Sequence, residues 1–187
     1  MQLRRTLLLL VALPALACQP RSEADGDEVP VRVGMVAVDH SNSPVVILEE
    51  REGERWLPIW VGSFEAQSIA AEMDEEKPPR PNTHDLARSL IAGLEGVVER
   101  VVVTELREGT YYALLSVRAH GRVLQIDSRP SDAIAIALRV RAPIFVRSGV
   151  FEAATEGTDS EPGRPIGWRS PPPAPIGTPQ ATHGLEL

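Results

Sequence analysis

The stretch "VLQIDSRPSDAIAIALR", residues 123–139, decides the fold. Its first residues form an apolar run that is typical of a strand, and its second half carries Ala and Ile at helical spacing. Between the two halves stand Asp127, Arg129 and Asp132, and Pro130 suits the first turn of a helix. The stretch therefore predicts a strand over 123–127, a polar corner, and a helix over 131–140.

The flanking sequence predicts six more strands and two more helices. The strands are expected over 31–38, 44–50, 57–61, 98–106, 111–119 and 142–146, and the helices over 64–73 and 83–93. Turn-forming stretches such as "REGT" and "HGR" join consecutive strands. In the second helix, Leu86, Leu90 and Ile91 are expected to face the core. This irregular order favours an α+β fold over a doubly wound sheet. We expect a mixed, mostly antiparallel sheet with about three helices packed on it.

The length and the two ends of the chain predict its domain organisation. A chain of 187 residues suffices for one compact domain and is too short for two good cores. Its N-terminus, "MQLRRTLLLLVALPALACQP", has the layout of an export leader, and its apolar run is too short to cross a bilayer as a stable helix. We expect a signal peptide over 1–17, an acidic tether over 18–30, the domain over 31–154 and a disordered Pro/Gly-rich tail over 155–187.

Cys18 is the single cysteine, which excludes an intramolecular disulfide. Its place after "ALA" resembles the cleavage box of bacterial lipoproteins, although Ala15 and Leu16 depart from the usual residues of that box. The alternative is an ordinary secretory leader that leaves a free thiol. In both cases we expect export, and with lipidation of Cys18 the protein is anchored to the membrane in the cell envelope, facing away from the cytoplasm.

The polar corner at residues 127–132 has two interpretations. Asp127 ends a strand and Asp132 lies in the first turn of a helix, so both carboxylates can converge with Ser131 and the free helix amides. Together with Arg129, such a corner could hold a phosphate or a divalent cation. The plain alternative is helix capping, with Arg129 paired to Asp127.

The stretch "RPNTHDL" and the residue Glu65 supply further candidates. Arg80, His84 and Asp85 lie beside a helix start, where His84 could carry a proton and Asp85 could orient it or bind a cation. The alternatives are a surface histidine and acids that only complement the helix dipole.

Two stretches echo each other. Both "LPIWVGSFEAQSIAAEM" and "LQIDSRPSDAIAIALRV" read as a strand, a polar turn with an acid, and a helix rich in Ala and Ile. Two copies of one structural unit would explain the echo, and shared secondary structure alone would also explain it.

The motifs "LPIWVGSFEAQSIA", "RPNTHDL", "GTYYALL", "IDSRPSDAIAIALR" and "PIFV", in this order, resemble the bifunctional nuclease domain family. Members of that family are described as having DNase and RNase activity, and they are usually intracellular. The resemblance covers residues 31–154. It implies a compact α+β domain that hydrolyses phosphodiester bonds, with DNA or RNA as the substrate.

The resemblance also implies that the polar residues of these motifs form the site. By chemical inference, His84, Asp85, Asp127 and Asp132 are the catalytic candidates, with His84 as the proton carrier. Phosphate binding is assigned to Arg80, Arg129 and Ser131. A divalent cation, Mg²⁺ or Mn²⁺, is expected on Glu65, Asp85, Asp127 and Asp132.

The charge balance keeps a second function open. The chain has 19 basic and 26 acidic residues and a formal net charge of -7, whereas a nucleic-acid binder normally has a basic footprint. Cations that bridge to phosphates would reconcile the acidity with a nuclease. The alternative is a non-catalytic binding or interaction module that retains the family fold. A homo-oligomer is left open.

Overall fold

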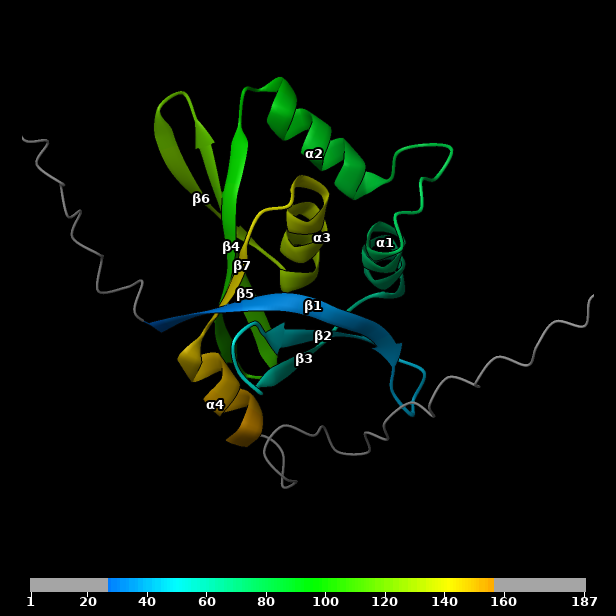
Figure 1. The fold of residues 1–187 in the computed structure, drawn as a ribbon, viewed down its shortest axis with the longest axis vertical. Coiled ribbons are helices and arrows are strands. Elements are labelled where there is room, and N and C mark those ends of the chain that lie inside the picture. The colour runs from blue at the N-terminus through cyan, green and yellow to red at the C-terminus, as the bar shows by residue number, and fades with distance from the viewer. Residues whose placement is uncertain (1–26, 157–187) are drawn as a thin grey trace, which may run out of the picture.

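The domain is built on one seven-stranded sheet (Figure 1). The computed structural model describes residues 27–156. The strands are β1 (Glu28–Val38), β2 (Pro44–Glu50), β3 (Trp56–Trp60), β4 (Val97–Arg107), β5 (Thr110–Ala119), β6 (Arg122–Ser128) and β7 (Ile144–Arg147). They are ordered β3-β2-β1-β7-β4-β5-β6, and every neighbouring pair is antiparallel except β4 and β7. The expected α+β fold with a mixed, mostly antiparallel sheet is confirmed.

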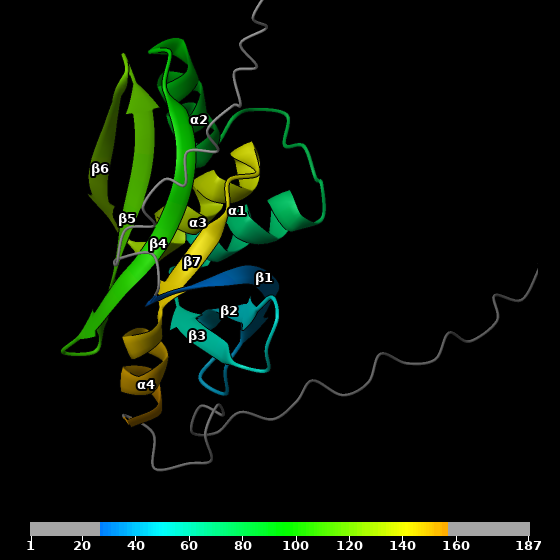
Figure 2. The same cartoon turned by 60° about the vertical axis from the view of Figure 1, so that its left-hand side comes forward.

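Four helices accompany the sheet: α1 (Ser63–Met73), α2 (Thr83–Gly93), α3 (Pro130–Val140) and α4 (Ser148–Glu156). The first three gather on one side, whereas α4 lies apart from them at the end of β7 (Figures 1 and 2). The helix α4 was not expected, because nine residues are too few to show a clear helical period. Its Val150 and Phe151 are nonetheless buried in the core.

The topology contains the same unit twice. The strands β1, β2 and β3 form an antiparallel meander that leads into α1, and β4, β5 and β6 form a second meander that leads into α3. The strands β3 and β6 are the two outer strands of the sheet, and the two helices that follow them contact each other. This arrangement favours the interpretation of the sequence echo as two copies of one unit.

The core includes much of α3 and corrects the expected face of α2. In α3, Ala133, Ile134 and Ala137 are fully buried. In α2, Leu86 and Leu90 are 55% and 57% exposed. The inward face of α2 instead follows His84, Ala87 and Ile91, which recur at i, i+3 and i+7, so the two leucines fall on a flank.

Several expectations fall on residues outside the described range. The export leader, the lipidation candidate Cys18, most of the acidic tether and the tail beyond residue 156 belong to this group. Among residues 27–156, no helix is long and apolar enough to cross a membrane.

Candidate functional site

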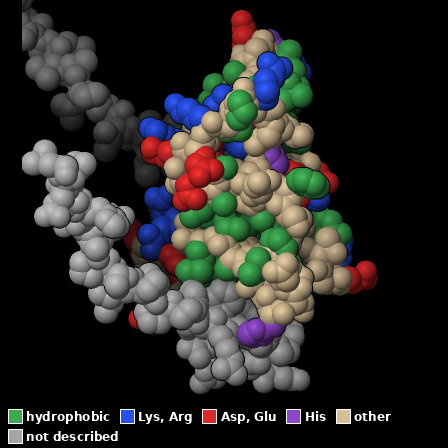
Figure 3. Space-filling view, turned by 90° about the vertical axis from the view of Figure 1, so that its right-hand side faces the viewer, with side chains coloured by type: hydrophobic (Ala, Val, Ile, Leu, Met, Phe, Trp, Pro, Cys, Tyr) green, Lys and Arg blue, Asp and Glu red, His purple; other side chains and the backbone are tan. Residues whose placement is uncertain are grey.

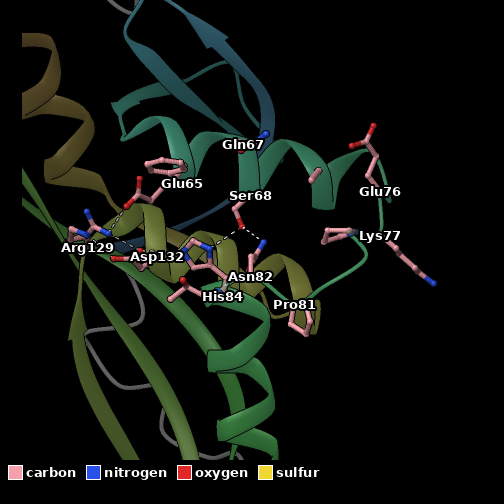
Figure 4. A pocket seen from close by; sticks show the side chains of 14 residues that line it. Glu65, Gln67, Ser68, Glu76, Lys77, Pro81, Asn82, His84, Arg129 and Asp132 are labelled. Atoms are coloured by element: carbon pink, nitrogen blue, oxygen red, sulfur yellow. Dashed lines mark hydrogen bonds and ion pairs between the residues drawn. The ribbon is translucent and has the colours of Figure 1, made fainter.

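A pocket of about 860 Å³ opens between α1, the loop that follows it, and the first turns of α2 and α3. Figure 4 shows its lining side chains, which come from stretches far apart in the sequence. The lining consists of Phe64, Glu65, Gln67, Ser68, Ala71, Glu76, Lys77, Pro78, Pro81, Asn82, Thr83, His84, Arg129 and Asp132. Four of the residues singled out from the sequence are among them: Glu65, His84, Arg129 and Asp132.

Arg129 binds two carboxylates at once. It precedes α3, whose first residue is Pro130, so Asp132 stands three positions further on. The Arg129 Nε donates to Asp132 Oδ2 at 2.7 Å, and Nη2 donates to Asp132 Oδ1 at 3.0 Å. The same Nη2 donates to Glu65 Oε1 at 2.7 Å. One guanidinium therefore ties the first turn of α1 to the first turn of α3 (Figure 4).

Glu65 is held in place from its own side as well. Its backbone N–H and then the Arg129 guanidinium lower the pKa of the Glu65 carboxyl below its ordinary value. The residue before α1 is Gly62, and a Cβ at that position would overlap the Glu65 carboxylate. A glycine at position 62 therefore leaves room for the ion pair between Glu65 and Arg129.

His84 lies between a carboxylate and a hydroxyl. It is 8% exposed, its Nε2 lies 3.2 Å from Asp132 Oδ1, and its Nδ1 lies 2.9 Å from Ser68 Oγ. The Ser68 oxygen also accepts hydrogen bonds from Asn82 Nδ2 at 3.0 Å and from Arg139 Nη2 at 2.9 Å. A hydroxyl has two acceptor lone pairs and one proton, so the Ser68 proton goes to Nδ1. This pattern assigns the imidazole proton to Nε2, which donates it to Asp132.

The row of Ser68, His84 and Asp132 is not a nucleophilic triad. In such a triad the serine oxygen is open to the substrate, and its proton passes to the histidine. Here Ser68 is 6% exposed and both of its lone pairs are occupied. The hydrogen-bonded chain of Ser68 and His84 therefore orients Asp132 and does not supply a serine nucleophile.

Asp132 is ionised despite its partial burial. Burial raises its pKa, but the hydrogen bonds from Arg129 and from His84 outweigh this effect, so its pKa lies below the ordinary value of 3.8. The pocket thus presents a carboxylate whose two oxygens are both oriented by named donors.

Asp85 is turned away from the pocket, toward Arg139. Arg139 Nε donates to Asp85 Oδ1 at 2.7 Å, and only 2% of the Arg139 side chain is exposed. Asp85 Oδ2 accepts from the backbone N–H of Asn82, while the Asn82 side chain accepts from the amides of His84 and Asp85, which completes a capping box. Burial raises the pKa of Asp85, but these hydrogen bonds outweigh it and the pKa is lowered.

The structure does not bring Asp127 to the pocket, so the expected convergence of Asp127 with Asp132 is wrong. Asp127 on β6 pairs with Leu114 on β5. The two residues on either side of Leu114, Ala113 and Leu115, face the core under the helices. Successive residues of a strand alternate between faces, and paired residues share one face. Asp127 therefore projects from the opposite face of the sheet.

Two further phosphate-binding candidates lie outside the pocket lining. Ser131 is buried in the first turn of α3, with 5% exposure, and Arg80 is an exposed residue of the loop before α2. Neither belongs to the lining residues.

The four carboxylates expected to bind a cation are not assembled. Asp127 lies on the other face of the sheet, Asp85 is paired with Arg139, and Glu65 and Asp132 share Arg129. Within residues 27–156, no group of three or more His, Cys, Asp or Glu side chains could hold a metal ion. As arranged, these residues do not fit Mg²⁺ or Mn²⁺.

Two supporting residues, Ser68 and Arg139, were missed in the sequence. Ser68 gave no signal, because a serine on a helix is most often a surface residue. Arg139 did give one: it is the only charged residue of the stretch "AIAIALRV", and a charge on an otherwise apolar helix requires a partner. That partner, Asp85, lies in another helix.

Comparison with known proteins places these motifs in one family. The family model of the bifunctional nuclease domain matches residues 46–158. The uncharacterized protein Rv1829 of Mycobacterium tuberculosis is 46% identical over 122 residues, which cover 65% of this chain and 73% of that protein. Bifunctional nuclease 1 of Arabidopsis thaliana is 30% identical over 112 residues, 58% of this chain and 34% of that protein.

A rice relative extends the comparison. Bifunctional nuclease 2 of Oryza sativa subsp. japonica is 29% identical over 165 residues, which cover 79% of this chain and 50% of that protein. The resemblance read from the motifs is confirmed. The matched segments make up half or less of the two plant proteins.

Replacing Arg139 tests the polar support. The substitution Arg139→Met leaves Asp85 buried without its cation and removes one donor from Ser68, so we expect the free energy of unfolding to fall by about 3–5 kcal/mol. Arg32→Met is the matched control, because Arg32 pairs with Glu49 at the surface, 66% exposed, and such pairs contribute about 0–1 kcal/mol. Chemical denaturation measures both, and equal small losses would contradict the account.

Acid should weaken the fold through the same carboxylates. Because the pKa values of Glu65, Asp85 and Asp132 are lowered in the folded state, their stabilisation is complete above the ordinary values of 4.5 and 3.8. This stabilisation is lost as the pH falls through the lowered pKa values of the folded state, because the carboxylates of the unfolded chain bind protons at a higher pH than those of the folded chain. We expect denaturation curves to show this loss below about pH 4, and the loss should be smaller in Asp85→Asn. An equal loss in the variant would exclude Asp85 as a cause.

Proposed function

The chain belongs to the bifunctional nuclease domain family, and from this premise we propose that the pocket around Arg129 hydrolyses phosphodiester bonds of DNA, RNA or both. Two findings support the proposal. The family motifs supply four side chains that line one pocket, and the named plant relatives are called bifunctional nucleases. For this chain the activity is an inference, because the plant proteins extend well beyond the matched segment.

The observation that carries the proposal is the unfinished hydrogen bonding of Arg129. A guanidinium has five N–H donors, and Arg129 directs the one on Nε and the two on Nη2 to Asp132 and Glu65. The two donors on Nη1 have no partner among the described residues, and 65% of the side chain is exposed. The positively charged Nη1 can donate these N–H groups to the oxygens of a phosphate.

In this proposal, Asp132 takes up the proton of the attacking water. It lines the pocket as a carboxylate beside Arg129, and a carboxylate in such a position can accept a proton from water as a general base. Arg129 lowers the pKa of Asp132 in the free protein. When a phosphate shares the Arg129 charge, this effect weakens, and Asp132 becomes a better base in the complex.

Glu65 and His84 act as positioning residues in this scheme. Glu65 accepts a hydrogen bond from the same Arg129 Nη2 that donates to Asp132, so the guanidinium is held between the two acids. His84 donates its Nε2 proton to Asp132 Oδ1 and fixes the direction of that oxygen. As the water oxygen bonds to phosphorus, one ester P–O bond breaks and the leaving oxygen takes a proton from solvent. Arg129 stabilises the charge that develops on the phosphorus-bound oxygens during this step.

No step of this scheme passes through a divalent cation. Glu65 and Asp132 are both bound to Arg129, so a cation on them would have to displace the guanidinium. The requirement for Mg²⁺ or Mn²⁺ expected from the motifs is a separate question, which the cleavage assay addresses through parallel reactions with each metal and with EDTA.

The sequence of residues 1–17, which has the layout of an export leader, supports a location in the cell envelope, where the substrate would be foreign or scavenged nucleic acid. Lipidation of Cys18 would keep the protein on the membrane. Cell fractionation tests this part of the proposal, and recovery of the full-length protein in the cytoplasmic fraction would oppose it.

One observation also favours the alternative of a non-catalytic binding module. Arg129 is already paired with Glu65 and Asp132 and keeps N–H donors on Nη1, and such an arrangement can hold an anionic ligand without further chemistry. Binding of nucleic acid without cleavage, under every metal condition, would favour this alternative.

Cleavage assays on full-length variants test the proposed site. We expect Asp132→Asn to lower the cleavage rate by about 100-fold or more, because the loss of a general base costs about 10²–10⁴-fold. Asp127→Asn is the matched control: it removes one carboxylate five residues away, on the other face of the sheet, and should cleave like the wild type. Thermal unfolding confirms that both variants are folded. Cleavage lost in Asp127→Asn and retained in Asp132→Asn would refute the assignment.

A further inference from the structure

Phe64 is an exposed aromatic residue at the rim of the candidate site. It is 86% exposed, the highest value among the large exposed hydrophobic residues of the described chain, and it lines the pocket next to Glu65. Burying a phenylalanine side chain stabilises a fold by about 1.5–3 kcal/mol. The exposed Phe64 does not provide this stabilisation. The side chain therefore contributes little to the core, and its role has to be sought at the pocket.

Its ring also lacks the cationic cover that three other aromatic rings have. Arginine guanidinium groups stack over Phe151 and Tyr112 at 4.6 Å from the ring centroids, and another lies 6.0 Å from that of Phe145. Within residues 27–156, no such cation lies over Phe64. Its ring faces are available to a planar group from outside the chain.

The charges of the pocket disfavour a binding mode that relies on many phosphate contacts. Its lining has three acids, Glu65, Glu76 and Asp132, against the bases Lys77 and Arg129. On the face that carries α1 and its following loop, Lys and Arg side chains are interspersed with acidic and apolar ones and form no continuous band (Figure 3). Glu76 and Lys77 point away from His84 (Figure 4). Duplex binding depends mainly on such a band, because phosphate contacts supply most of its affinity.

Single strands can be bound in another way. A base stacked on an aromatic side chain contributes about 1–3 kcal/mol, whatever its sequence, and this contribution comes from the ring face and not from phosphate contacts. Inside a duplex, both faces of a base are covered by its neighbours, so Phe64 can stack only on an unpaired base. The pocket of about 860 Å³ falls within the usual range for small-ligand sites, so it is large enough for one nucleotide unit.

We propose that the site takes single-stranded nucleic acid, with an unpaired base stacked on Phe64 and the adjacent phosphate on Arg129 Nη1. Glu65 links the two positions, because it is the next residue after Phe64 and binds Arg129. The inference rests on the proposed function of the pocket and adds its substrate class. It also assigns Phe64 as a residue that contacts the substrate.

Binding and cleavage by the full-length protein test this inference. Short DNA and RNA oligonucleotides, single-stranded and as duplexes of the same sequence, are titrated by fluorescence anisotropy in EDTA and then assayed for cleavage. Phe64→Ala should weaken single-strand binding about 5–150-fold and leave duplex binding unchanged. Phe64→Trp should retain single-strand binding. Leu94→Ala is the matched control, because Leu94 is 69% exposed and lies outside the pocket.

The outcomes separate this inference from the proposed function. Unchanged single-strand binding in Phe64→Ala, or equal losses for single strands and duplexes, would overturn the substrate class, while cleavage by the wild type would still support hydrolysis. Binding that depends on Phe64, without cleavage by the wild type, would support the single-strand site and refute hydrolysis.

Discussion

The site depends on one hydroxyl group. Because Ser68 Oγ accepts hydrogen bonds from Asn82 and Arg139, its proton can only go to His84, and the imidazole must then offer its own proton to Asp132. Asp132 in turn fixes Arg129. A single hydroxyl on α1, with its donors on α3 and at the start of α2, thus sets the orientation of His84 and, through it, of Asp132 and Arg129.

The repeated unit explains where this network forms. Glu65 and Asp132 are each the third residue of the helix that follows a three-stranded meander, and the two helices contact each other, so the two acids meet. Only the second unit has an arginine at the position before its helix. Arg129 can therefore bind the acid of its own unit and that of the other, which produces one asymmetric site at the junction of two similar halves.

Local signals in the sequence were sufficient for most of the fold and for part of the site. Alternating apolar residues and turn-forming stretches predicted the strands, and the motifs predicted Glu65, His84, Arg129 and Asp132 as neighbours. Asp127 was misplaced because five residues along the chain do not reveal the strand register that turns its side chain to the other face. The pairing of Arg139 with Asp85 spans 54 residues, a separation over which helical periodicity carries no information.

The proton position on His84 tests this account most directly. A long-range ¹H–¹⁵N correlation spectrum of the full-length protein, with the His84→Gln variant to identify the signals, reports which ring nitrogen carries the proton. We expect a neutral imidazole with its proton on Nε2 and an unprotonated Nδ1 that accepts from Ser68. A proton on Nδ1 of the neutral ring would refute this assignment, because Ser68 would then have to accept three hydrogen bonds and Asp132 would lose the hydrogen bond from His84.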